Sequence, residues 1–192
     1  MVRNDLSEDL VHWTKGTYDE AYEALLSICF DGYIRGGNRG VFTKENCVCF
    51  TETPTETFHS KTIGNLKPFG VRVSKRWAFS EGALPVIYQP ASHIENLADG
   101  IKWRHVDFSI DDSEQRRNYT WQREWRIKVN YLYLPKDLTL IVPNKLWAEK
   151  LMSDINEENI LRGCEDNMDL GYFYTHRPVL SSGFTILWLD IN

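Results

Sequence analysis

The chain has 192 residues and a mass of 22.5 kDa, enough for one domain that buries about 70% of the surface its unfolded form exposes. Its net charge of -5 and pI of about 5.6 argue against tight nonspecific binding to nucleic acid. No apolar run approaches the roughly 20 residues that a membrane helix requires, and the four cysteines lack zinc-site spacing. We therefore expect a cytoplasmic protein with reduced thiols and no membrane segment.

The first forty residues predict a strand, a helix and a loop. Residues 10–14 read as a short strand, and Thr17 with Glu20 three positions later forms a capping-box signature at a helix start. Gly32 is suited to end that helix in a left-handed conformation. The glycine-rich stretch from 36 to 40 then predicts a loop that can bend around a ligand.

The middle of the chain predicts further strands. Residues 46–51 are strand-like, residues 69–75 alternate in polarity, and residues 85–90 form an apolar run bounded by prolines. Lys75 shares the apolar face of its strand but stands at the strand's end. Residues 91–118 are weakly patterned and receive no assignment.

The last third predicts an alternating strand over residues 121–129, a buried strand over 138–142, a helix over 145–155 and a closing strand over 185–189. Strands outnumber helices and alternate with them irregularly. This order favours an α+β fold with a mixed, mostly antiparallel central sheet and peripheral helices. No linker or repeat divides the chain, so we expect a single domain over residues 1–192.

Alternation along residues 121–129 puts four polar residues on one strand face, namely Gln122, Glu124, Arg126 and Lys128. A carboxylate flanked by two cations is either a structural salt-bridge ladder or a functional group that is held ionised. The strand alone favours the ladder. The order of other motifs along the chain favours the functional interpretation.

Three segments in order, His12-Trp13-Thr14, Asp31-Gly32-Tyr33-Ile34 and Gln122-Arg123-Glu124-Trp125-Arg126, resemble the ADP-ribosyltransferase superfamily. The likeness is greatest to the DarT-like toxins, which have a His-Phe-Thr type strand, a helix with a glycine-bearing turn, and a late catalytic Glu. This resemblance implies an ADP-ribosyltransferase-like fold. It also implies NAD as co-substrate and transfer of ADP-ribose to a nucleic acid or protein.

A second resemblance is to the AbiGi antitoxins of abortive-infection systems. It is carried by residues 49–54, by Phe69-Gly70-Val71 with Lys75, by residues 85–88 and by Glu124-Trp125-Arg126. The chain departs from the DarT-like pattern after the second strand. That pattern has an arginine there, whereas this chain has Thr51-Glu52-Thr53-Pro54, so Lys75 or Arg35 would have to supply the cation.

The resemblance to ADP-ribosyltransferases implies a role for each matching residue. Breaking the ribose–nicotinamide bond builds positive charge on the ribose, which a fixed carboxylate stabilises in the transition state. The implied catalytic residues are Glu124 and Lys75. The implied NAD-binding residues are His12, Trp13, Thr14, Tyr33, Arg35, Thr51, Trp77 and Gln122.

Three functions stay open from the sequence. The first is an NAD-dependent ADP-ribosyltransferase acting as a toxin or phage-defence effector, with a cognate antitoxin as a further partner. The second is a non-catalytic binding module, an antitoxin or defence-system partner, with the same fold. The third, a nuclease, would need Asp111, Asp112 and Glu114 to cluster around metals, although they lie close together in one apparently exposed segment.

Overall fold

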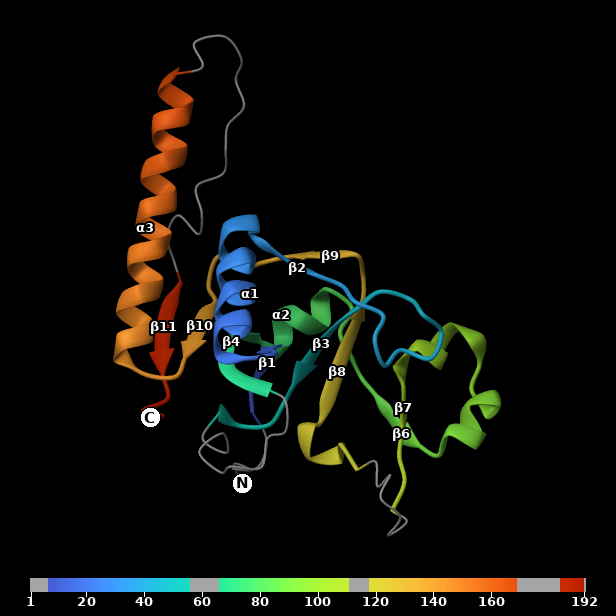
Figure 1. Ribbon diagram of the computed structural model, residues 1–192. Helices are drawn as coiled ribbons and strands as arrows, with labels where there is room; N and C mark the ends of the chain where they lie inside the picture. Colours follow the sequence, from blue (N-terminus) through green and yellow to red (C-terminus); the bar gives the residue numbers. More distant parts are fainter. Residues whose placement is uncertain (1–6, 56–65, 111–117, 169–183, 192) are drawn as a thin grey trace. The chain divides into compact units, whose positions relative to one another are not determined.

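The computed structural model describes residues 7–55, 66–110, 118–168 and 184–191 (Figure 1). The helices are α1 (Tyr18–Asp31), α2 (Lys75–Ser80) and α3 (Lys145–Met168), with 3-10 helices η2 (Ala91–Asn96), η3 (Asp99–Arg104) and η4 (Thr120–Gln122). The strands are β1 (Asp9–Lys15), β2 (Tyr33–Arg35), β3 (Cys47–Thr51), β4 (Leu66–Ser74), β5 (Leu84–Pro85), β6 (Ile87–Gln89), β7 (His105–Asp107), β8 (Glu124–Lys128), β9 (Tyr131–Tyr133), β10 (Thr139–Val142) and β11 (Thr185–Trp188).

The main sheet has seven strands in the order β11-β10-β4-β1-β3-β8-β5. β10 and β11 run parallel, whereas β4 with β10, β1 with β3, β3 with β8 and β5 with β8 are antiparallel. Two small sheets, β2-β9 and β6-β7, complete the strand pairing. The predicted α+β class with a mixed, mostly antiparallel sheet is confirmed.

The chain forms two compact units, each assembled from separate stretches. The described part of unit 1 comprises residues 7–12, 35–55, 73–110 and 118–132. It contains β3, β5 and β8, and a core cluster of Val41, Cys47 and Trp103 against which Leu84 packs. Every residue of the candidate site described below that carries a charged side chain belongs to this unit.

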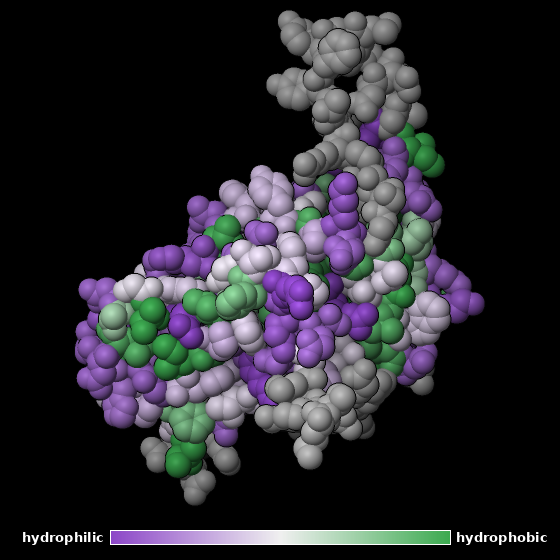
Figure 2. All heavy atoms as spheres, turned by 180° about the vertical axis from the view of Figure 1, so that it is seen from behind, coloured by the Kyte–Doolittle hydropathy of each residue, from purple (hydrophilic) through white to green (hydrophobic). Residues whose placement is uncertain are grey.

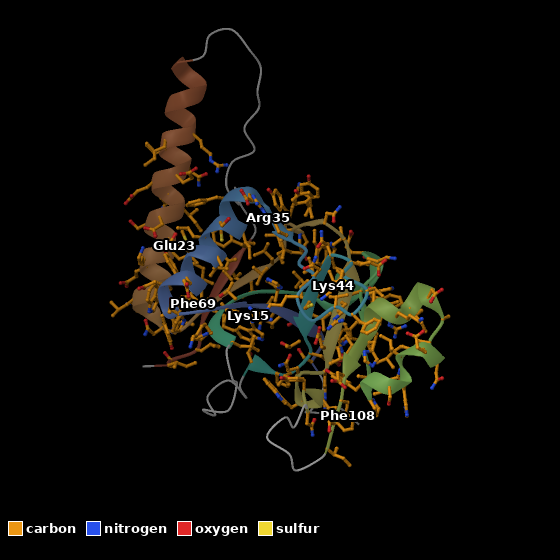
Figure 3. All side chains as sticks on the ribbon, turned by 45° about the vertical axis from the view of Figure 1, so that its right-hand side comes forward. Lys15, Glu23, Arg35, Lys44, Phe69 and Phe108 are labelled. Carbon is orange, nitrogen blue, oxygen red and sulfur yellow. The ribbon has the colours of Figure 1, made fainter. Side chains whose placement is uncertain are left out.

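The described part of unit 2 comprises residues 13–34, 66–72, 133–168 and 184–191. Its helix α1 begins with the predicted capping box at Thr17 and ends at Gly32, whose φ is 71°. Under α1, the ring of Phe69 lies edge-on to Tyr22 at 5.8 Å and to Trp147 of α3 at 5.0 Å (Figure 3). These aromatic contacts join both helices to strand β4 of the sheet.

The predicted strand over 69–75 is β4 over 66–74, and Lys75 begins α2 instead of ending the strand. Three further predicted elements differ more in extent. The alternating strand starts at Glu124, because residues 120–122 form η4 and Arg123 adopts a left-handed φ of 44°. The apolar run at 85–90 is split by Val86 into β5 and β6, which belong to different sheets. Helix α3 continues to Met168, well past the predicted end at residue 155. Among the described residues, no helix is both long and apolar enough to cross a membrane.

Candidate functional site

Strand β3 lies between the strand that carries His12 and the strand that carries Glu124. Val11 of β1 is opposite Thr51 of β3, and Thr51 is opposite Glu124 of β8. The implied NAD site needs His12 and Glu124 to face one ligand, but the strands that carry them are not neighbours. The alternation within each strand identified the strands correctly, but it carried no information about a third strand between them.

The same register puts the two predicted reactive groups on opposite faces of the sheet. Cross-strand partners share a face and consecutive residues alternate, so Glu124 is on the face of Val11 and Thr51. His12 follows Val11 and is on the other face. The ring of His12 lies edge-on to Phe50, the residue before Thr51, with centroids 6.0 Å apart. The structure does not bring His12 and Glu124 into one hollow.

Glu124 forms an ion pair along its own strand. Its Oε1 accepts a hydrogen bond from Nε of Arg126 at 2.7 Å, and both side chains are largely buried. The guanidinium of Arg126 also donates to the carbonyl oxygens of Trp103 at 2.9 Å, His105 at 3.2 Å and Gly40 at 3.4 Å. Of the two interpretations of this polar strand face, the pair of Glu124 with Arg126 agrees with the structural one, whereas Lys128 pairs with Glu45 and not with Glu124. The guanidinium ties β8 to the main chain at Gly40 and at residues 103–105.

The main chain at Glu124 is fixed by the residues that follow β5. The amide N–H of Glu124 donates to the hydroxyl oxygen of Tyr88 at 2.9 Å, and Val86 donates its N–H to the Glu124 carbonyl at 3.0 Å. Burial raises the pKa of Tyr88 to about 12, so its phenol stays protonated at neutral pH. Glu124 is thus held through both its side chain and its main chain.

A second carboxylate, Glu52, is the centre of a polar cluster that the sequence did not predict. Its Oε1 accepts from Nζ of Lys75 at 2.7 Å, and its Oε2 accepts from Nε1 of Trp125 at 2.9 Å. Its amide N–H is shared between the carbonyls of Gln122 and Arg123, at 3.2 and 3.3 Å. We call Glu52, Lys75 and Trp125 the Glu52 cluster; Glu52 is only 8% exposed.

The Glu52 cluster occupies the position where the DarT-like pattern has an arginine. Lys75, expected as a substitute cation, does reach this strand end, but its ammonium is paired with Glu52. One feature of the sequence could have indicated this cluster. Glu52 is an acidic residue that directly follows a buried strand and precedes Thr53-Pro54. The sequence alone did not indicate which cation would meet it.

His12 lies on the same sheet face as the Glu52 cluster. Trp125 is opposite Phe50, and the register of β1 with β3 aligns His12 with Phe50 as well. Nδ1 of His12 lies 2.8 Å from the carbonyl oxygen of Cys49, so this nitrogen carries the proton and donates. His12 is half-buried.

Three predicted NAD-binding residues belong to unit 2. Trp13 and Thr14 are buried, and the Thr14 hydroxyl donates to the Phe69 carbonyl at 3.1 Å within the sheet. Tyr33 lies edge-on to Tyr133 with ring centroids 5.7 Å apart. These contacts are structural, and the proposed ligand roles of these residues stay predictions.

The other predicted NAD-binding residues belong to unit 1. Arg35 is exposed on β2 (Figure 3), Trp77 is partly exposed on α2, and Thr51 is buried. Gln122 contributes its carbonyl oxygen to the amide of Glu52. Of the predicted residues, Lys75 belongs to the Glu52 cluster, and Gln122 accepts a hydrogen bond from the Glu52 amide.

Among the described residues, no three His, Cys, Asp or Glu side chains are grouped so that they could hold a metal ion. The carboxylates considered for a nuclease, Asp111, Asp112 and Glu114, lie outside the described residues. Comparison with protein-family models, with curated proteins and with solved structures found no match. The geometry of unit 1 is therefore the basis on which a function is assigned.

Proposed function

We propose that this chain is a non-catalytic binding module of a toxin–antitoxin or phage-defence system, related in fold to the ADP-ribosyltransferases. The observation that carries the proposal is the separation of His12 and Glu124 onto opposite sheet faces. Each group is also engaged by the fold, His12 with the Cys49 carbonyl and Glu124 with Arg126. Groups on opposite faces of one sheet cannot contact the same ribose, as the predicted reaction requires.

The segments that resemble the AbiGi antitoxins support this proposal, because several of them contact one another in unit 1. Glu52 bonds to Lys75 and to Trp125, and the Tyr88 hydroxyl accepts from the amide of Glu124. Residues that carry a family likeness and also bond to one another support a functional proposal more strongly than short matches scattered along the chain.

The proposal is tested by giving the purified chain NAD. With labelled NAD and total cellular RNA, DNA and protein, we expect neither label transfer nor nicotinamide release. A thermal-shift measurement with NAD should leave the melting temperature unchanged, whereas a ligand present at 100 times its dissociation constant adds about 2.7 kcal/mol to stability. Nicotinamide release above the rate of a buffer control would overturn the proposal.

A second candidate, an NAD-dependent ADP-ribosyltransferase toxin, is favoured by one observation. Glu52 is on the same sheet face as His12, and it is held rigidly by Lys75 and Trp125. In this version Glu52, rather than Glu124, would stabilise the positive charge that builds on the ribose as nicotinamide leaves. His12, on the same sheet face, would contact a ribose hydroxyl.

The two candidates differ in what expression of the chain does to a host cell. The binding module leaves growth unchanged when the chain is expressed alone. An active toxin arrests growth, and Glu52→Gln should then relieve the arrest, whereas Glu45→Gln, which changes an exposed carboxylate of unit 1, should not. Arrest relieved equally by both substitutions would contradict the role of Glu52.

A further inference from the structure

The outer edge of β11 is the feature from which we infer a further property of this chain. β11 is the terminal strand in the sheet order, and no strand in the described residues pairs with its outer side. The N–H groups of Thr185 and Leu189 donate to carbonyl oxygens of the β10 segment. In a parallel pair alternate residues bond to the same neighbour, so the main-chain groups of Ile186 and Trp188 face outward.

The side chains of the same two residues line an open apolar groove in unit 2. The groove has a volume of about 560 Å³ and lies between β11 and α3, where Ala148 and Met152 contribute further apolar surface. Trp188 is 44% exposed. Figure 2 shows hydrophobic side chains on the side of the molecule where α3 and β11 lie. Ile186 and Trp188 therefore offer both main-chain hydrogen-bonding groups and apolar surface.

Nothing in the sequence of β11 protects this edge. Natural edge strands commonly carry a charged residue, a proline or a bulge that prevents pairing with another chain. β11 reads Thr185-Ile186-Leu187-Trp188, without any of these, and it pairs with β10 in regular register. An edge of this kind is suited to accept an additional strand.

We propose that this strand is β11 of a second copy of the chain, paired antiparallel about a two-fold axis at Leu187. This register sets Ile186 opposite Trp188 of the partner subunit, and it sets Trp188 opposite Ile186 of the partner subunit. Each of these two pairs exchanges two main-chain hydrogen bonds. An aliphatic–aromatic cross-strand pair is a favourable combination. The outward-facing residues of both strands are thereby satisfied at once.

Charge at the groove favours a second copy over a partner of one charge sign. The groove is lined by Lys145 and by Glu149, which lie one helical turn apart on α3 and are both mainly exposed. A two-fold axis brings the same surface patch of each copy against the other, so the patch must complement itself. Lys145 and Glu149 form an ion pair at 3.5 Å within one copy, so the patch has no net charge and two copies placed against each other do not repel.

Sedimentation equilibrium of the full chain at several concentrations tests the proposal. We expect a dimer, and we expect Trp188→Lys to weaken it by at least tenfold because two charged side chains would meet apolar surface. Circular dichroism of that variant should match the wild type. The control is Trp121→Lys, which changes a similarly exposed tryptophan in unit 1 and should leave the dimer intact. A wild-type monomer, or a Trp188→Lys dimer of undiminished stability, overturns the proposal.

Disulfide trapping tests the register independently. Leu187 stands opposite its own copy in the proposed pairing, so Leu187→Cys should form a covalent dimer under mild oxidation, above the background of the wild-type thiols. Thr185→Cys is the matched control, because the introduced thiol would be roughly 13 Å along the strand from the equivalent thiol of the second copy. A covalent dimer from Thr185→Cys alone, or from neither variant, overturns the two-fold axis at Leu187.

Discussion

Glu124 and Arg126 are two residues apart on β8, with Oε1 and Nε 2.7 Å apart and both side chains largely withdrawn from water. Three main-chain carbonyls from Gly40, Trp103 and His105 satisfy the rest of the guanidinium. Because a buried charge needs its partners, this pair matters more for the integrity of unit 1 than for any exposed chemistry.

Arg126→Met should destabilise the protein by about 3–5 kcal/mol, because it leaves Glu124 as a buried carboxylate without its partner. Urea unfolding followed by circular dichroism measures the change. Lys128→Met at the end of the same strand is the control: its pair with Glu45 is exposed, so its removal should cost at most about 1 kcal/mol. Equal losses for both variants would refute the structural role given to Arg126.

Gly36→Ala should destabilise the protein by about 1–3 kcal/mol, because a Cβ at this position would lie 2.0 Å from the carbonyl oxygen of Val129. The backbone cannot move away easily, since the Gly36 N–H donates to the Asn130 carbonyl at 2.8 Å. A Cβ at Gly37 would have no atom within 4 Å, so Gly37→Ala should change the free energy of unfolding by no more than about 0.5 kcal/mol. Thermal unfolding of the two variants side by side checks this difference, and a stable Gly36→Ala protein would contradict it.

Asp154 should make the stability of the protein depend on acid pH. Burial acts to raise the pKa of Asp154, but hydrogen bonds from Lys150 and Tyr22 outweigh it and hold that pKa below the usual 3.8. The stabilisation is therefore present above the unfolded pKa and is lost as pH falls through the lower folded value.

Asp154→Asn should accordingly lower the free energy of unfolding at pH 7 and change it much less near pH 2. Urea titrations at several pH values measure this. The exposed carboxylate of Asp137 provides the control, since Asp137→Asn should have a small effect at every pH. A loss for Asp154→Asn that is constant from pH 7 to pH 2 would show that the carboxylate is not stabilised by ionisation.

The cysteines should differ sharply in their reaction with iodoacetamide. Burial raises the pKa of Cys29 to about 12, so roughly one molecule in ten thousand carries the thiolate at pH 8. Cys49 is half-buried and should be alkylated before Cys29. Mass spectrometry of labelled peptides gives both rates, and labelling in urea should make them equal. Rapid labelling of Cys29 in the folded protein would mean that α1 opens readily.

The elements that the sequence predicted well are those whose signals are local. The capping box at Thr17 and Glu20 and the left-handed Gly32 depend on residues a few positions apart, and both are present. The predicted strand over residues 121–129 is a strand only from Glu124 to Lys128, because residues 120–122 form η4 and Arg123 is its left-handed end. Alternation of polar and apolar residues cannot detect a 3-10 turn whose left-handed corner is formed by an arginine.

The candidate site was predicted less well, because it depends on register between strands. The opposite faces of Trp125 and Arg126 follow from the period of one strand and were predicted correctly. The alignment of Thr51 with Glu124, and the insertion of β3 beside β1, are set by long-range packing that no single strand encodes. For the same reason the contact between Glu52 and Lys75 was not foreseen.

Both units draw their strands from distant parts of the chain, and this has a consequence for biosynthesis. Unit 2 needs β11 beside β10, and its stretches are separated along the chain by residues 73–132, which belong to unit 1. Neither unit is one uninterrupted stretch, so no single fragment consists of one unit alone. Contacts between residues this far apart in sequence slow folding and prolong the time for which unpaired strands are exposed to proteases.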